Sequence, residues 1–156
     1  MIARRRDATS DPPWIDGYPL DGDVRACVAY ISHLPTVSGS GESSPFGYYQ
    51  VLENGVVVAG IGFHGPPNGR VVEVGYGVAP AARGRGVATD ALRLLLRLAS
   101  GLDGVRRVVG RTEEANVASQ RVMMAAGMLP AGRDADFLHF GIDLREPDSW
   151  GRTASA

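Results

Sequence analysis

Hydrophobic and polar positions follow two different rhythms along the chain, and each rhythm predicts one kind of element. Val56–Phe63 and Val71–Val78 are short apolar runs bounded by turn residues, which is typical of strands. A third run, Tyr48–Leu52, ends at Asn54-Gly55, a strong hairpin signal. Pro80 ends the series, because proline cannot donate to a sheet ladder. These runs predict an antiparallel meander of three strands.

Apolar residues at helical spacing predict three helices. The first covers Asp23–Leu34. The second covers Val87–Ala99, where the leucine stripe is broad enough to imply burial against a sheet. The third begins after Asn116, a suitable N-cap residue, and runs to about Ala126, just before Gly127.

Two further strands, over Val105–Thr112 and about Phe137–Leu144, complete the series. The order of elements indicates an α/β or α+β fold, in which helices pack on one sheet. A chain of 156 residues, 44% of them hydrophobic, is long enough for one buried core. We therefore expect a single domain over residues 21–145, an irregular lead-in over 1–20 and a tail over 146–156.

Composition excludes several classes of protein. No apolar stretch approaches the length of a membrane span, and no apolar signal core follows the basic start Met1–Arg6, so we expect a cytoplasmic protein without a membrane partner. A net charge of −1 gives no electrostatic footprint for nucleic acid. The single cysteine, Cys27, excludes an internal disulfide framework and a multi-thiolate site, and no metal is expected. The oligomeric state is open, with a homodimer as one option.

The stretch that carries chemistry is the turn between the third strand and the second helix. Residues 83–88, Arg-Gly-Arg-Gly-Val-Ala, open directly into that helix. The first N–H groups of a helix lack intrahelical partners and lie at the positive end of its macrodipole. Gly84 and Gly86 carry no side chain that would keep a phosphate away from these amides. The turn therefore predicts a site for a phosphate or pyrophosphate.

A glycine-rich turn before a helix can also be a nucleotide P-loop, a dinucleotide site or a purely structural cap. A nucleotide P-loop needs a lysine, and all 16 basic residues of the chain are arginine. A dinucleotide site needs a third glycine, where Thr89 stands, and it follows the first strand of a βαβ unit. A glycine turn that only caps a buried helix stays open, although two arginines in the same turn favour an anion site.

The same residues resemble the GCN5-related N-acetyltransferase (GNAT) superfamily. Its signature Arg/Gln-x-x-Gly-x-Gly/Ala is matched at Arg83, Gly86 and Ala88. Glu73–Val78 before the turn and residues 112–127 after it are similar to the branch that acetylates ribosomal-protein N-termini. The resemblance covers about residues 46–144. It implies a mixed, mostly antiparallel central sheet with helices packed on both faces, and acetyl-CoA as co-substrate.

The resemblance also implies roles for individual residues. Val78 and Ala79 would offer backbone groups to the pantetheine arm, with Val78 N–H as the donor to the thioester oxygen. Asn116 would contact the cofactor or order the site, and Ser119 would lie near its sulfur. The pyrophosphate would be held by the whole turn: Arg83, Gly84, Arg85, Gly86, Val87 and Ala88.

Direct attack of an amine on a thioester needs a base, an oxyanion donor and a weak acid. Glu73 is the candidate base, because desolvation in an apolar run would raise its pKa; a glutamate that faces water from an edge strand is the alternative. Met123 stands where many family members place a tyrosine acid. Ser119 is therefore the candidate that stabilises the leaving thiolate, or it only caps a helix. His64 and His139 are further candidates for the acceptor pocket.

Together these residues favour an enzyme that moves an acetyl group from acetyl-CoA directly to a primary amine, on a small molecule or a protein N-terminus. The alternative is a non-catalytic acyl-CoA-binding or sensing module, because the turn serves both. Transfer of a longer acyl group such as succinyl is a third option. Glu73 and Ser119 favour the enzyme, while Tyr76 is expected to pack in the core.

Overall fold

The computed structural model describes residues 2–3, 12–32 and 44–144, with side chains for 12–26 and 44–144. The Cys27 side chain, residues 1 and 4–11 of the expected lead-in and the expected tail over 146–156 lie outside this part of the chain. None of the described helices is long and apolar enough to cross a membrane.

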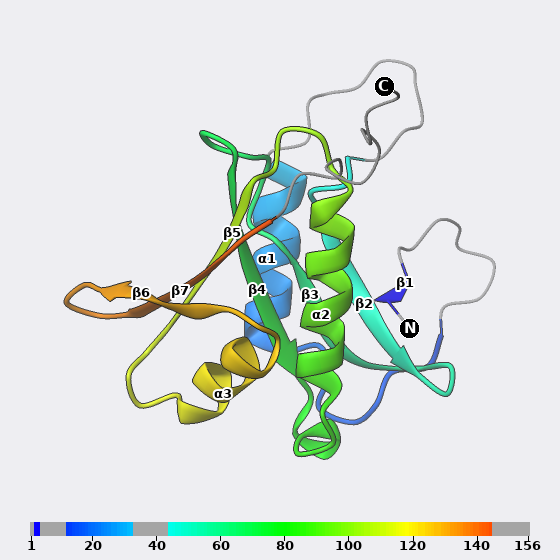
Figure 1. The fold of residues 1–156 in the computed structure, drawn as a ribbon. Helices are drawn as coiled ribbons and strands as arrows, with labels where there is room; N and C mark the ends of the chain where they lie inside the picture. The colour runs from blue at the N-terminus through cyan, green and yellow to red at the C-terminus, as the bar shows by residue number, and fades with distance from the viewer. Residues whose placement is uncertain (1, 4–11, 33–43, 145–156) are drawn as a thin grey trace, which may run out of the picture.

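Seven strands form one mixed sheet in the order β1-β2-β3-β4-β5-β7-β6 (Figure 1). Between the described strands, β4 and β5 make the parallel pair and all other neighbours are antiparallel. The strands are β1 (Ile2–Ala3), β2 (Tyr48–Glu53), β3 (Val56–Phe63), β4 (Val71–Val78), β5 (Arg107–Thr112), β6 (Leu129–Arg133) and β7 (Leu138–Asp143).

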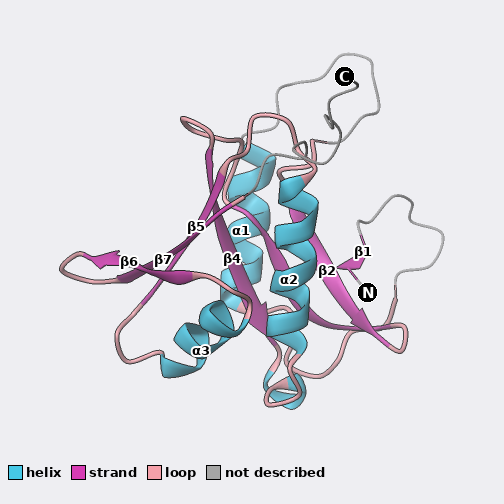
Figure 2. Cartoon of the chain, in the orientation of Figure 1, coloured by secondary structure: helices cyan, strands magenta, loops and turns pink. Residues whose placement is uncertain are grey.

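Helices cover both faces of the sheet, as the resemblance implied. The helices are α1 (Asp21–Ser32), α2 (Val87–Ser100) and α3 (Val117–Ala125). Helix α1 packs on β2, β3 and β4 from one side, whereas α2 packs on β3 and β4 from the other and contacts α3. Figures 1 and 2 show α1 behind the central strands and α2 in front of them. The mixed, mostly antiparallel sheet with two covered faces confirms the predicted fold class.

Local signals in the sequence account for most element boundaries. Asn54 and Gly55 adopt the positive φ angles, 50° and 82°, that a tight hairpin requires between β2 and β3. Pro80 stops β4 and begins a short 3₁₀ turn, Pro80–Ala82. Asn116 caps α3 by accepting a hydrogen bond from Ser119 N–H at 3.1 Å, as predicted.

The sequence analysis missed β6, because this strand has no buried face. All five of its residues are exposed, and it contains Pro130 and Gly132, which are unfavourable inside a strand. It pairs only with β7 at the edge of the sheet, where such residues are tolerated. The two-residue β1, paired through Ile2 with Val51, falls inside the expected irregular lead-in.

The core lies mainly between α2 and the sheet. The fully buried side chains from this region include Leu92 and Leu95 on α2, Ile61 on β3 and Val108 on β5. The predicted leucine stripe is narrower than expected, because Leu94 and Leu98 lie on the solvent side of α2. The packing of α2 fixes the start of the helix against the end of β4, where the candidate site lies.

Replacing Leu92 with alanine should destabilise the fold by about 2–5 kcal/mol, because the deletion leaves a cavity against the sheet. Leu94→Ala on the same helix is the matched control. The Leu94 side chain is 40% exposed, so its removal should lower the free energy of unfolding much less. Urea unfolding monitored by circular dichroism measures both values. Equal losses for the two variants would contradict the placement of the core.

Candidate functional site

Strands β4 and β5 pair over only three residues before they part. The register joins Val71 to Arg107, Val72 to Val108 and Glu73 to Val109, and within the described sheet no later residue of β4 pairs with β5. The rest of β4 is held from one side only, by β3. The parting leaves one edge of β4 open from Val74 onward.

The backbone of β4 directs alternate residues to its two edges. Ala79 N–H donates to Val58 O at 3.0 Å, and Glu73 O accepts from His64 N–H at 2.8 Å, so odd-numbered residues bond toward β3. Even-numbered residues therefore direct their N–H groups toward the open edge. Val78 N–H is one of them, and it faces the gap, as its predicted role as an oxyanion donor requires.

A cavity of about 650 Å³ opens on the side of the sheet that carries α2 and α3. Most residues predicted to hold the cofactor line it: Val78, Arg83, Gly84, Gly86, Val87, Ala88, Asn116 and Ser119. Turn, strand end and helix start thus converge on one space. We call this space the larger cavity.

Two predicted residues do not line the larger cavity. Ala79 is fully buried, and both of its backbone groups are used within the fold, by Val58 O and by Ala82 N–H. Arg85 points away and pairs with Glu53 at 2.9 Å. Arg83, by contrast, lines the cavity and donates from Nε to Val78 O at 3.1 Å, which ties the turn to the end of β4.

The start of α2 offers free donors to the larger cavity. Gly86 is the N-cap in a left-handed conformation, with φ 80°, and no side chain caps the helix. Gly84 has φ 75°, a conformation that favours glycine, and a Cβ atom at either position would meet no protein atom within 4 Å. Uncapped amides, the helix dipole and Arg83 together make this end of the cavity suitable for an anion.

Two hydroxyl groups meet at the other end of the larger cavity. Tyr76 Oη lies 2.9 Å from Ser119 Oγ and donates to Ser119 O at 3.1 Å. Burial raises the pKa of Tyr76, an effect that the hydrogen bond to Ser119 opposes, so the phenol stays protonated at neutral pH. Met123, the residue in place of the family tyrosine, is buried in the core. The hydroxyl of Ser119 faces Tyr76, while the backbone N–H of Ser119 donates to Asn116, which caps α3.

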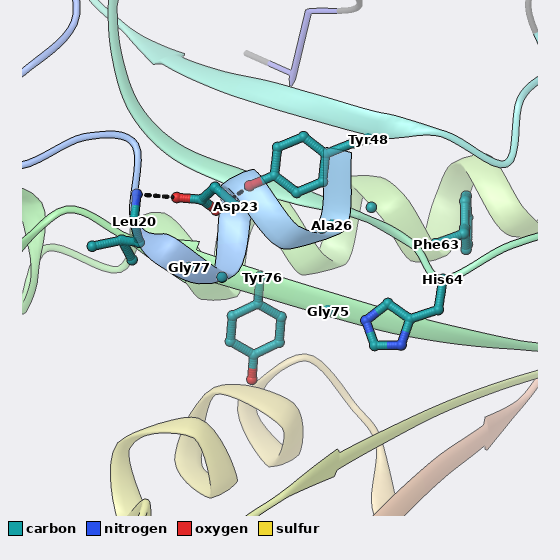
Figure 3. A pocket seen from close by; sticks show the side chains of 11 residues that line it. Leu20, Asp23, Ala26, Tyr48, Phe63, His64, Gly75, Tyr76 and Gly77 are labelled. Carbon is teal, nitrogen blue, oxygen red and sulfur yellow. Dashed lines mark hydrogen bonds between the residues drawn. The ribbon is translucent and has the colours of Figure 1, made fainter. Parts of the chain in front are cut away.

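A smaller cavity of about 260 Å³ lies on the opposite side of the sheet, under α1 (Figure 3). Its floor is formed by glycines of β3 and β4, among them Gly62, Gly75 and Gly77. A Cβ atom at Gly77 would approach Leu20 of the chain leading into α1 to 2.8 Å. The glycines therefore create the space, because larger residues on this face of the strands would fill it.

A buried carboxylate fixes one wall of the smaller cavity. Asp23, only 4% exposed, accepts hydrogen bonds from Leu20 N–H at 2.7 Å and from the hydroxyl of Tyr48 (Figure 3). These bonds join the first turn of α1 to β2. The Tyr48 side chain lies across Gly60, where a Cβ atom would collide with its hydroxyl.

Glu73 lies near the smaller cavity, but it does not have the environment that the sequence predicted. Its Oε1 accepts from Arg111 Nε at 2.9 Å and lies 3.3 Å from His64 Nδ1. The hydrogen bond with His64 lowers the pKa of Glu73, burial opposes this, and the charge of Arg111 lowers it further. The expectation of a raised pKa is therefore wrong, because partners from β3 and β5 outweigh desolvation.

The two cavities meet at β4. Leu20, Tyr76 and Gly77 line both of them. A ligand held at the start of α2 and a second ligand under α1 would therefore approach each other beside Val78 N–H. This arrangement suits group transfer between two ligands that enter from opposite faces of the sheet.

Sequence reasoning undervalued two residues of this arrangement. Tyr76 was expected only to pack in the core, and no local signal reveals that its hydroxyl reaches α3, 43 positions along the chain. His64 was named only as a candidate, but it lines the smaller cavity beside Glu73. His139, the other candidate, pairs with Asp134 at 2.7 Å and lines neither cavity.

Comparisons with known proteins show the family of the chain. The chain matches the family described as "Acetyltransferase (GNAT) domain" over residues 5–129. It is 29% identical over 90 residues to YjdG of Bacillus subtilis, an uncharacterized N-acetyltransferase; the match covers 56% of this chain and 53% of YjdG. The chain thus spans about half the length of this curated relative.

Two solved structures share the fold. RimJ of Mycobacterium smegmatis, in complex with CoA-disulfide, has a TM-score of 0.56 at 22% identity, over 62% of this chain and 52% of RimJ. The acetyltransferase PseH of Campylobacter jejuni, in complex with acetyl coenzyme A, has a TM-score of 0.54 at 16% identity, over 62% of this chain and 66% of PseH.

The carboxyl group of Glu73 should titrate below its ordinary pKa of 4.5 in a ¹³C NMR titration. Because the folded-state pKa is lowered, the carboxylate stabilises the fold above pH 4.5 and loses this contribution as the pH falls through the folded-state value. His64→Ala removes the hydrogen bond that lowers the pKa of Glu73 most, so the titration midpoint of Glu73 should move upward. A wild-type midpoint above 4.5 would contradict the observed ion pairs.

Proposed function

The chain belongs to the GNAT acetyltransferase family, and from this premise we propose that it transfers the acetyl group of acetyl-CoA directly to a primary amine. The amine is carried by a small molecule or by a protein N-terminus. The observation that carries the proposal is the meeting of two cavities, from opposite faces of the sheet, at Tyr76 and Gly77. One space suits the donor and the other suits the acceptor.

The larger cavity fits acetyl-CoA by its donors. The uncapped start of α2, with Gly84 and Gly86, and the guanidinium of Arg83 suit the pyrophosphate. Val78, Asn116 and Ser119 line the same cavity, and Ser119 contacts Tyr76, which lines both cavities. RimJ and PseH, which share the fold, were solved with CoA-disulfide and acetyl coenzyme A, and this supports the same co-substrate here.

In the proposed reaction, Val78 N–H donates to the thioester oxygen and stabilises the negative charge that develops there. The hydroxyl pair of Tyr76 and Ser119 donates to the sulfur as the carbon–sulfur bond breaks. Serine replaces the family tyrosine only in part, because its pKa is high. Tyr76 contributes a second hydroxyl to the same position and helps to orient that of Ser119.

The smaller cavity suits a small acceptor group. Its volume of about 260 Å³ lies below the range of pockets for drug-sized ligands, which begins at about 300 Å³. Its polar groups are the carboxylate of Asp23, the phenols of Tyr48 and Tyr76 and the imidazole of His64, set among apolar walls. We infer that a primary amine on a short side chain or chain terminus enters here, beside the pair of His64 and Glu73.

Acetyl-CoA should raise the melting temperature, because a ligand that binds only the folded state stabilises it by about 2.7 kcal/mol at a hundredfold excess over its dissociation constant. NAD and ATP should not. Gly86→Asp should abolish the response, because the side chain and its charge enter the anion position. Differential scanning fluorimetry measures both effects.

Gly104→Asp is the matched control for this experiment. Gly104 has φ 81°, close to the 80° of Gly86, and equally open surroundings, but it lines neither cavity. Both variants therefore carry the same backbone strain, and only Gly86→Asp should lose the ligand response. An equal response of the wild type to all three ligands would refute the assignment. Binding without release of free CoA in the presence of an amine panel would instead indicate an acyl-CoA-binding module.

Ser119→Ala and Tyr76→Phe should each lower turnover by about 10- to 100-fold at every pH, because a hydrogen bond to a charged group contributes about 1.5–3 kcal/mol. Binding of acetyl-CoA should change little. Free-CoA release against an amine panel measures turnover. Ser100→Ala, whose hydroxyl bonds to Arg97 O at the far end of α2, is the control. Wild-type rates in both site variants would remove the hydroxyl pair from the reaction.

A further inference from the structure

Glu73 is poorly suited to accept a proton from the acceptor amine. Its Oε1 is shared by Arg111 Nε at 2.9 Å and His64 Nδ1 at 3.3 Å, and its side chain is only 31% exposed. Both partners stabilise the charged carboxylate, and proton uptake would break these contacts. A carboxylate held in this way is better suited to hold the side chains of His64 and Arg111 in place than to act as a base.

His64 lies between Glu73 and the smaller cavity. Its backbone N–H donates to Glu73 O at 2.8 Å, which anchors the residue at the end of β3. Its ring reaches over Gly75, where a Cβ atom would collide with Nε2 (Figure 3). The glycine thus admits the imidazole, whose Nδ1 faces Glu73 and whose Nε2 lies against Gly75.

We propose that His64 Nε2 takes the proton of the acceptor amine, and that Glu73 is a positioning residue that accepts the Nδ1 proton and holds the ring. This inference rests on the proposed acetyl transfer, whose base it names. A carboxylate on one ring nitrogen fixes the tautomer that leaves the lone pair on the other. Arg111, stacked 5.0 Å from the ring centre of Phe137, in turn holds Glu73.

The proton and bond changes balance without a further reactant. The acceptor ammonium gives one proton to His64 Nε2, and the neutral nitrogen then forms a bond to the thioester carbon and gives its second proton to solvent. The carbon–sulfur bond breaks and its electron pair stays on sulfur, which takes a proton from the hydroxyl pair of Ser119 and Tyr76. His64 returns its proton to solvent, and solvent restores the hydroxyl, so the products are an amide and free CoA.

Spacing along β4 favours His64 over Glu73. The cavities meet at Gly77, two residues from Gly75 and four from Glu73. At about 3.3 Å per residue, these separations are about 7 Å and 13 Å. The imidazole over Gly75 is therefore closer to an amine at the junction than the carboxylate of Glu73, which would need a longer chain of waters to reach it.

Other ionisable groups face the same space and bear on any pH profile. Asp23 on α1, Tyr48 on β2 and Tyr76 on β4 line the cavity with His64, and Arg111 on β5 reaches it through Glu73. Asp23 is already engaged by Leu20 N–H and Tyr48, and the phenol of Tyr76 by Ser119. The described structure leaves His64 as the imidazole that borders the cavity.

The first test compares His64→Gln, Glu73→Gln and the wild type by free-CoA release across a pH series. The turnover of His64→Gln should be about 10²- to 10⁴-fold lower than that of the wild type at neutral pH. It should recover at high pH, where the amine is already neutral. Glu73→Gln should lose less, with kcat falling and KM unchanged. His139→Gln is the matched control, because His139 also pairs with a carboxylate but lines neither cavity.

Wild-type rates in His64→Gln together with a large loss in Glu73→Gln would overturn the proposal and return the role of base to Glu73. The thermal response to acetyl-CoA should be intact in all these variants. If acetyl-CoA did not raise the melting temperature of the wild type, the proposed function itself would fail. Failure of the proposed function can therefore be distinguished from failure of the proposed base.

A second measurement does not depend on knowing the acceptor. In ¹⁵N NMR of the neutral imidazole, His64 should carry its proton on Nδ1 and leave Nε2 unprotonated. Glu73→Gln should weaken this preference, because the neutral amide accepts less strongly than the carboxylate. A wild-type imidazole protonated on Nε2 would overturn the proposal whatever the turnover shows.

Discussion

The parting of β4 from β5 after Glu73 is the constraint on which the candidate site depends. Buried backbone groups require partners, and those on the open edge of β4 find none in a neighbouring strand. Val78 O is satisfied by Arg83, while Val78 N–H is directed into the gap. Continued pairing with β5 would satisfy that N–H and close the passage between the two faces of the sheet. The open edge of β4 is thus what leaves the direction of Val78 N–H available for the proposed contact with a substrate.

Alternation along β4 divides the chemistry between the two faces. Glu73, Gly75 and Gly77 face α1, where the glycines leave room for a ligand and for the imidazole of His64. Tyr76 and Val78 face the other side, where Tyr76 meets Ser119. One strand therefore supplies the proposed acceptor side with space and the proposed donor side with a hydroxyl. This division follows from the two-residue period of an extended chain, in which neighbours point to opposite faces.

The elements of the fold could largely be predicted from local signals. The bounds of β3 and β4 were predicted from apolar runs, α2 from its leucines, and α3 from the Asn116 cap. Strand β6 could not be, because an exposed edge strand has no buried face and hence no hydrophobic period. The candidate anion-binding turn could also be proposed from the sequence, since glycines and arginines before a helix have a local physical meaning that does not depend on the rest of the chain.

The sequence by itself determined most of the strands and helices and the glycine- and arginine-rich turn before α2, because these depend on neighbours within a few positions. Tertiary structure alone decided how the side chains act together. Glu73 was expected to have a raised pKa from burial in an apolar strand, but β3 and β5 bring His64 and Arg111 to its carboxylate and lower it. Arg83 and Arg85 lie in the same turn, yet Arg85 pairs with Glu53 and Arg83 lines the larger cavity. Such electrostatic partners come from distant positions, and only the folded sheet brings them within a few ångströms.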